Sequence, residues 1–314
     1  MKYLRLFVRL LLFAALAFTA FAIIIYPERY ISCCLQGFLL WAECVLPSLF
    51  PFMVISMIFI KTGAAEKAAL PLKRITGFFS LPPAAAVCFL ISICSGYPAG
   101  SRAVAEFYED GSITERDAGK LAALCSTSGP LFVIGSVGVK MFCDKSAGWK
   151  ILLAHALSVI AVALILSLVS KKENTRKLKR GVPEKNVLYN AFYGSVTAVL
   201  VAGGFIAFFC VAAQIAYDFN LLYPLEQLLC LFTNKDAASA VCRGIIEVTA
   251  GCRALSACTE KLALPFAGFL ITFGGISIIL QQLCYLVKAK VKPIKFILVK
   301  LVQAALCFAL LLLF

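Results

Sequence analysis

The sequence predicts an all-α, polytopic membrane protein with about seven to eight transmembrane helices plus two re-entrant hairpins in an inverted repeat. Three observations predict it. The chain has 314 residues of which 62% are hydrophobic, basic residues cluster between apolar runs, and two glycine-broken apolar segments each carry an arginine. A soluble domain is roughly half apolar, and the mean hydropathy here is +0.94, so lipid is the expected solvent.

The N-terminal apolar run, residues 4–26, follows basic residues and resembles the start of a secretory signal peptide. Because the run is longer than a signal-peptide core and further spans follow, we expect an uncleaved first helix. Residues 31–46 contain Gln36 and Glu43 and are expected to form an interfacial or tilted helix leading into the next span. The remaining apolar stretches are 47–60, 121–139, 151–170, 195–217, 262–287 and 296–314.

The net charge of +14 comes from 30 lysine and arginine residues, of which 18 lie in four clusters at the ends of the apolar runs. Short loops rich in lysine and arginine stay on the cytoplasmic side, so we expect the N-terminus and the basic loops there, with the lipid bilayer as a partner. Anchoring of the topology explains this charge, and no nucleic-acid partner is expected. The clusters are Lys2/Arg5/Arg9, Lys61/Lys67/Lys73/Arg74, residues 171–185 and Lys288/Lys290/Lys292/Lys295.

The side chains offer no familiar catalytic or metal-binding pattern. The 14 cysteines include no CxxC spacing, and His155 is the only histidine. We therefore expect no zinc or haem site, although cysteines distant in sequence can still meet in space. No nucleophile–base pair, HExxH motif or nucleotide-binding loop is present, so an enzyme is not expected.

The order of elements divides the chain into five parts. We expect a first transmembrane helix at 1–30, followed by a first repeat at 31–150. A linking helix and basic loop occupy 151–186, a second, inverted repeat occupies 187–290, and a last helix occupies 291–314.

Two short signatures relate the repeats. AGSRA at 99–103 matches AGCRA at 250–254, and SGPLF at 128–132 lies where FGGIS lies at 273–277. The first hairpin, 78–110, is tipped by SGYPAGSR, and the second is expected to break at VTAGCRA (248–254). With all basic loops on one side, the two hairpins enter the membrane from opposite sides.

Broken segments at membrane depth are tolerated only inside protein or beside a water-filled cavity, and paired breaks in two halves indicate a transporter's binding site. Hydroxyl groups at the breaks either bind the solute or satisfy freed carbonyl groups. Gln214, Gln281 and Gln282 are further candidates for the cavity wall. The candidate substrate-binding residues are Ser95, Gly96, Tyr97, Gly100, Ser101, Arg102, Thr127, Ser128, Gly129, Glu247, Thr249, Gly251, Arg253, Thr272, Gly274 and Gly275.

The charged residues at the breaks allow two interpretations each. Arg102 and Arg253 suit the two carboxylates of one small dianion, because a guanidinium group binds a carboxylate with two hydrogen bonds. Alternatively, Arg102 pairs with Glu106 and Arg253 with Glu247. Glu247 itself either carries a coupling proton or sodium ion, or neutralises Arg243 one helical turn away.

The motifs SGYPAGSR (95–102), STSGPLFVIGSVG (126–138), EVTAG (247–251) and FGGISIILQ (273–281) resemble the sporulation integral membrane group of the nucleoside-recognition (Gate) domain family. The resemblance covers roughly residues 35–290. It departs from the family pattern near Ile278–Gln281, where a more polar stretch is expected. The matching positions are Ser95, Gly96, Tyr97, Pro98, Gly100, Ser128, Gly129, Pro130, Glu247, Gly251, Gly274 and Gly275.

The resemblance implies a role in endospore formation, in the bacterial cytoplasmic membrane or a membrane around the forespore. It also implies passage of a small solute, with dipicolinate, an aromatic dicarboxylate, as the implied cargo. The expected function is therefore secondary transport of a small organic anion, and an oligomer is compatible with the sequence. The alternatives are a nucleoside or nucleobase carrier and a non-transporting membrane scaffold of spore assembly.

Overall fold

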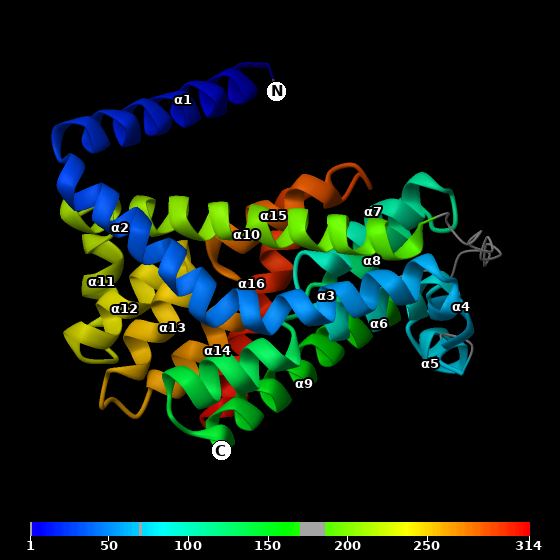
Figure 1. Cartoon of the computed structure of the whole chain (residues 1–314). Coiled ribbons are helices and arrows are strands. Elements are labelled where there is room, and N and C mark those ends of the chain that lie inside the picture. Colours follow the sequence, from blue (N-terminus) through cyan, green and yellow to red (C-terminus); the bar gives the residue numbers. More distant parts are fainter. Residues whose placement is uncertain (1, 69–70, 170–185) are drawn as a thin grey trace.

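The structure is a computed structural model that describes residues 2–68, 71–169 and 186–314, and this part of the chain is helical without β-strands (Figure 1). The all-α, polytopic class is confirmed. Five of the described helices are long and apolar enough to cross a membrane: Pro27–Lys61, Lys145–Leu168, Val187–Asp218, Ala263–Leu286 and Pro293–Leu311. The basic run at 171–185 lies outside the described residues.

The described elements follow one another with few residues between them. In chain order they are α1 (Lys2–Ile25), α2 (Pro27–Leu40), the π-helix η1 (Trp41–Val45), α3 (Leu46–Lys61), α4 (Ala64–Ala68), α5 (Lys73–Phe78), α6 (Ala84–Ser95), α7 (Ala99–Glu109), α8 (Glu115–Leu124), the π-helix η2 (Phe132–Met141), α9 (Lys145–Val169), α10 (Val187–Asp218), α11 (Tyr223–Leu229), α12 (Lys235–Ile246), α13 (Val248–Ser256), α14 (Ala263–Phe273), α15 (Gly275–Leu286) and α16 (Pro293–Leu311).

Helix α1 stands apart from the rest of the bundle (Figure 1). It contacts α2 and α10 near its C-terminal end, where the Phe18 and Phe219 rings meet edge to face at 4.9 Å. Large apolar side chains such as Phe13 and Ile24 remain exposed along it. An isolated helix with apolar groups on its outer surface is suited to lipid rather than to water.

The segment 31–46 is not a separate helix. It forms the first part of a continuous helical stretch of 35 residues, Pro27–Lys61, in which α2, η1 and α3 join without a loop. Pro47 lies at the start of α3, directly after the wide turns of η1. A π-helical turn at this point accommodates the proline, which has no N–H group to donate.

Helix α10 runs antiparallel to α2–α3 and packs along both (Figure 1). Gly37 lies against Ala207 and Cys210, whereas Met57, twenty residues later, lies against Gly194. Between these points, Trp41 Nε1 donates a hydrogen bond to the Val199 carbonyl oxygen at 3.1 Å. This antiparallel pair forms the axis around which the broken helices are arranged.

The remaining elements occur twice in the same order. α2–α3 is followed by the broken pairs α6/α7 and α8/η2 and then by the long helix α9, while α10 is followed by α12/α13, α14/α15 and α16. Because α2–α3 and α10 are antiparallel, the two series start in opposite directions, as an inverted repeat requires. The residue boundaries assigned to the repeats stay a prediction.

Candidate functional site

Broken segments from both halves meet at a cavity of about 40 Å³, here called the central cavity. One wall comes from the crossing of α2–α3 with α10, at Val45, Leu49, Ala202 and Ile206. This space admits water but not an organic solute. The polar side chains that line it belong to Tyr97, Ser128, Glu247, Thr249 and Gln281, and Gly129 also lies at its wall.

The first break lies between α6 and α7 at residues 96–98, as the SGYP motif predicts. Gly96 has φ +69°, and a Cβ atom there would lie 2.5 Å from the Gly129 backbone nitrogen. Gly100, in the first turn of α7, lies against the Cys125 carbonyl oxygen and the Ser92 side chain. Glycine is required at residue 96 both by its backbone conformation and by the close approach of the second broken segment.

The second hairpin breaks at Glu247, one residue before the predicted segment. Residues 248–254 are helical and belong to α13, so the position predicted for this break was wrong. Glu247 is extended (φ −134°, ψ 111°), and its carboxylate accepts hydrogen bonds from the Ala250 N–H at 2.7 Å and from Thr249 Oγ1 at 3.1 Å. The carboxylate itself caps α13, and this capping explains why the break precedes the helix.

Glu247 is fully buried, and in the described part of the chain it forms no ion pair with Arg243 or Arg253. The Arg243 guanidinium instead lies over the Tyr217 ring, 4.4 Å from its centroid. The structure therefore does not contain the two pairings of Glu247 considered from the sequence. A buried carboxylate without a cationic partner remains available for proton binding.

The last break separates α14 from α15 at two glycines with positive φ, Gly274 (+93°) and Gly275 (+64°). A Cβ atom on Gly275 would lie 2.9 Å from the Gly244 carbonyl oxygen on α12. Gly251 also lies against Gly244. The glycines of the second half thus bring two broken helices into backbone contact, as Gly96 and Gly129 do in the first.

A buried polar network behind the breaks was not predicted. The Ser128 N–H donates to His155 Nε2 at 3.2 Å, which leaves the Nδ1–H of a neutral ring to donate to Thr272 Oγ1 at 2.9 Å. On α16, fully buried Lys300 donates from Nζ to the Ser126 carbonyl oxygen at 2.8 Å, and its Nζ lies 5.6 Å from the centroid of the Tyr97 ring.

Lys300 has no carboxylate partner among the residues that the structure describes. It lies inside the apolar stretch 296–314, which looked like an uninterrupted span. A lysine within a transmembrane segment is itself a signal of function, so Lys300 could have been found from the sequence. His155 could not have been singled out in the same way, because its role depends on contacts with residues far along the chain.

The two arginines lie in different cavities. Arg102 lines a cavity of about 30 Å³, the Arg102 cavity, and its Nε donates to Glu106 at 2.8 Å. Arg253 lines a cavity of about 420 Å³, the Arg253 cavity, with Nη1 at 3.8 Å from a Glu43 carboxylate oxygen. The pairing of Arg102 with Glu106 is present, whereas Arg253 pairs with Glu43 rather than Glu247. One dianion held by both arginines is not compatible with this arrangement.

The Arg102, central and Arg253 cavities lie in sequence along α10. Their walls include Ala198, then Ala202 and Ile206, then Ala213 on this helix. At 1.5 Å per residue, the fifteen residues from Ala198 to Ala213 span about 22 Å. The same order recurs on α2–α3, so these cavities mark a path, here called the α10 pathway, that extends across most of a membrane's apolar thickness.

The other predicted site residues support the breaks. Thr127 Oγ1 lies 2.7 Å from Ser92 Oγ, and Ser101 Oγ donates to Gln282 Oε1 at 3.0 Å. Ser95 is buried at the wall of the Arg102 cavity. Of the predicted set, Tyr97, Ser128, Gly129, Glu247 and Thr249 line the central cavity, while Ser101, Thr127 and Thr272 belong to its supporting hydrogen bonds.

The chain is 26% identical, over 332 aligned residues, to the sporulation integral membrane protein YlbJ of Bacillus subtilis. The alignment covers 94% of this chain and 79% of that protein, and it confirms the resemblance to the sporulation group. No family model matches the chain and no solved structure matches it, so the Gate domain stays an expectation. The comparison supports an integral membrane protein with a role in sporulation.

Proposed function

We propose that this protein is a secondary-type transporter that moves a small organic anion, dipicolinate in the first instance, across a membrane during endospore formation. The observation that carries the proposal is the α10 pathway, whose central cavity lies where the broken segments of both halves meet. Discontinuous helices that surround a midplane site are typical of secondary transporters. A scaffold would need neither the cavities nor the breaks.

The unequal sizes of the cavities support alternating access. The Arg253 cavity, at about 420 Å³, can hold a small aromatic dicarboxylate, whereas the central and Arg102 cavities, at about 40 and 30 Å³, cannot. The pathway is therefore wide at the Arg253 end, here called the open end, and narrow at the centre and at the Arg102 end, here called closed. Movement of one half against the other would exchange the open and closed ends.

The charges along the pathway favour an anionic solute. Arg253 and Arg243 line the open cavity with a single carboxylate, Glu43, and Lys300 is buried behind Tyr97 without a carboxylate partner in the described chain. A buried cation is costly unless something compensates it, and a passing anion would do so. Arg253 and Arg102 would then contact the solute one after the other, at opposite ends of the pathway.

Glu247 points to a proton as the coupling ion. Its carboxylate lines the central cavity, where an ionised carboxylate would repel an anion. Protonation of Glu247 removes this repulsion and allows anion and proton to pass together. The Ala250 and Thr249 hydrogen bonds hold the carboxylate in place for this exchange.

A nucleoside carrier is the second candidate, because the central cavity also offers a neutral amide and hydroxyl groups at Gln281, Thr249 and Tyr97. Neutral bases are recognised by such groups, and cations add little. The buried Lys300 and the two arginines of the open cavity favour the anion instead. Competition between the two kinds of solute separates the candidates.

The test is uptake of radiolabelled dipicolinate into proteoliposomes under an imposed proton gradient. We expect uptake by the parental protein, loss with Lys300→Met, parental uptake with the exposed-site control Lys288→Gln, and no competition by excess uridine. Uptake of labelled uridine without uptake of dipicolinate would replace the anion by a nucleoside. Uptake of neither solute by correctly folded protein would contradict transport and favour the scaffold.

A further inference from the structure

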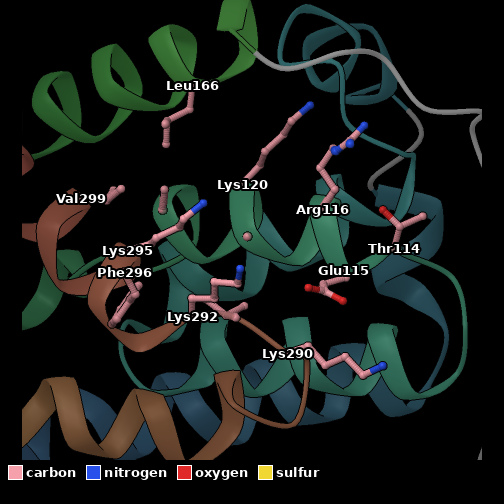
Figure 2. A pocket seen from close by; sticks show the side chains of 13 residues that line it. Thr114, Glu115, Arg116, Lys120, Leu166, Lys290, Lys292, Lys295, Phe296 and Val299 are labelled. Atoms are coloured by element: carbon pink, nitrogen blue, oxygen red, sulfur yellow. The ribbon is translucent and has the colours of Figure 1, made fainter. Parts of the chain in front are cut away.

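A second cavity with a different chemistry lies outside the α10 pathway. It has a volume of about 550 Å³ and lies between α8, the end of α9 and the start of α16 (Figure 2). Apolar side chains from Leu166, Phe296 and Val299 form part of its wall. Its size is sufficient for a small organic molecule.

The polar part of this wall is strongly cationic. Figure 2 shows Arg116 and Lys120 on α8, with Lys292 and Lys295 at the start of α16 and Lys290 just before it. Glu115 is the one carboxylate among its described lining residues. A cleft lined by one sign of charge concentrates counter-ions, so this cavity attracts anions.

The lysines of the α15–α16 connection are not neutralised within the described chain, where Lys290, Lys292 and Lys295 form no ion pair. The N-terminus of α16, a helix of 19 residues, has no side-chain cap, and its N-cap residue is Lys292 itself. Its first N–H groups therefore add positive partial charge to the same place. An anion bound between the three lysines and the α16 N-terminus would reduce the repulsion among these positive charges.

The cavity wall continues into contacts that join the two halves of the fold. Ala123 and Val299 line it, and Gln303 Nε2 donates to the Ala123 carbonyl oxygen at 2.8 Å. One turn earlier on α16, Lys300 bonds the Ser126 carbonyl oxygen at the end of the α8 segment. A ligand in the cavity would thus contact α8 of the first half and α16 of the second, next to the network that supports the central cavity.

We propose that this cavity binds an anion bearing phosphate or carboxylate groups, and that the anion bridges α8 and α16. The cations bind the charged groups, and the apolar wall accommodates an organic body or a lipid's glycerol region. The lysines at 290–295 then serve as ligand contacts as well as topology anchors. The inference does not depend on transport, because it concerns equilibrium binding at a site away from the α10 pathway.

The test uses the full chain in nanodiscs of phosphatidylcholine alone and measures binding of pyrophosphate by titration calorimetry. The triple variant Lys290→Gln/Lys292→Gln/Lys295→Gln removes three exposed charges and should weaken binding about tenfold. The control Lys145→Gln/Lys235→Gln/Lys261→Gln makes the same change in net charge at exposed lysines that do not line the cavity, and should leave binding unchanged.

A second arm identifies the source of the anion. Nanodiscs that also contain phosphatidylglycerol are compared by native mass spectrometry for retained lipid. If the parental protein retains phosphatidylglycerol and the triple variant at Lys290, Lys292 and Lys295 does not, the site binds a lipid headgroup. Pyrophosphate binding without lipid retention assigns the site to a soluble anion. If neither pyrophosphate binding nor lipid retention differs between the triple variant of the cavity lysines and the triple control variant, the proposed site is wrong.

Discussion

The Arg102 cavity and the Arg253 cavity share a sequence signature but differ in structure. Each arginine lies within the signature AGSRA or AGCRA, in the helix that follows a break. The Arg102 cavity has about 30 Å³ and the Arg253 cavity about 420 Å³. The Arg102 side chain is 37% exposed and pairs with Glu106 on its own helix, whereas the Arg253 side chain is 60% exposed and faces Glu43 on η1.

The difference shows that a repeat in sequence does not require the same conformation in both halves. In the closed cavity the ion pair is local and can persist through any movement of α7. In the open cavity the ion pair joins α13 to η1, so movement between these helices changes it. The open and closed ends therefore differ in which contacts a conformational change must break, and the following substitutions separate them.

The largest effect is expected at the break beside the closed cavity. Gly96→Ala puts a side chain on a residue with φ +69° and brings its Cβ to 2.5 Å from the Gly129 nitrogen. Backbone strain and overpacking together should lower the free energy of unfolding by roughly 3 kcal/mol. Thermal unfolding of the purified protein in detergent measures it.

Gly129→Ala is the matched control on the other side of the same contact. Its added Cβ would have no neighbour nearer than 3.6 Å, an ordinary van der Waals distance. We expect a change below about 1 kcal/mol. Equal destabilisation by the two substitutions would mean that the close approach of Gly96 is not what holds the first break.

A smaller effect is expected from the arginines, and it should be unequal. Arg253→Gln removes a cation from the open cavity and should weaken binding of dipicolinate about fivefold, as expected for one partly exposed charge. Arg102→Gln acts in a cavity too small for the solute and should change the affinity less than about twofold. Equilibrium binding of labelled dipicolinate measures both affinities. Equal losses of affinity in the two variants would mean that the solute does not bind preferentially in the Arg253 cavity.

The smallest effect is expected from the acidic partners. Glu106→Gln removes an ion pair between residues four apart on α7 and should lower the free energy of unfolding by about 0.3–0.5 kcal/mol. Glu43→Gln removes two longer contacts between half-exposed groups, 3.8 Å to Arg253 and 3.5 Å to Lys140, and should lower it by less. Chemical denaturation compares the two variants, and a larger loss with Glu43→Gln would show that the open cavity depends on its ion pair.

Much of the architecture could be predicted because it follows from composition and from glycine. The apolar spans follow from hydropathy, and the first break follows from SGYP, since Gly96 adopts a conformation that other residues rarely adopt. The second break was placed one residue late. It depends on Glu247, whose carboxylate caps α13, and a glutamate in an apolar context does not by itself indicate where a helix begins.

The relations between distant residues could not be predicted. The partner of Arg253 is Glu43, more than two hundred residues away in the chain, and only the packing of α2 and its continuation η1 beside α13 brings them together. The same holds for His155, which links Ser128 to Thr272. Periodicity and spacing describe one segment at a time, so they indicate which residues are unusual but not which cavity each one lines.

The most direct test of the central claim is thiol accessibility at two positions on α10. Ala198→Cys lines the Arg102 cavity and Gln214→Cys the Arg253 cavity, each placed in a background without the native cysteines. With a membrane-impermeant methanethiosulfonate in oriented vesicles, Gln214→Cys, at a partly exposed position, should react rapidly from one face only. Ala198→Cys should react slowly, and only from the opposite face. Rapid reaction of both from the same face would contradict a pathway that is open at one end and closed at the other.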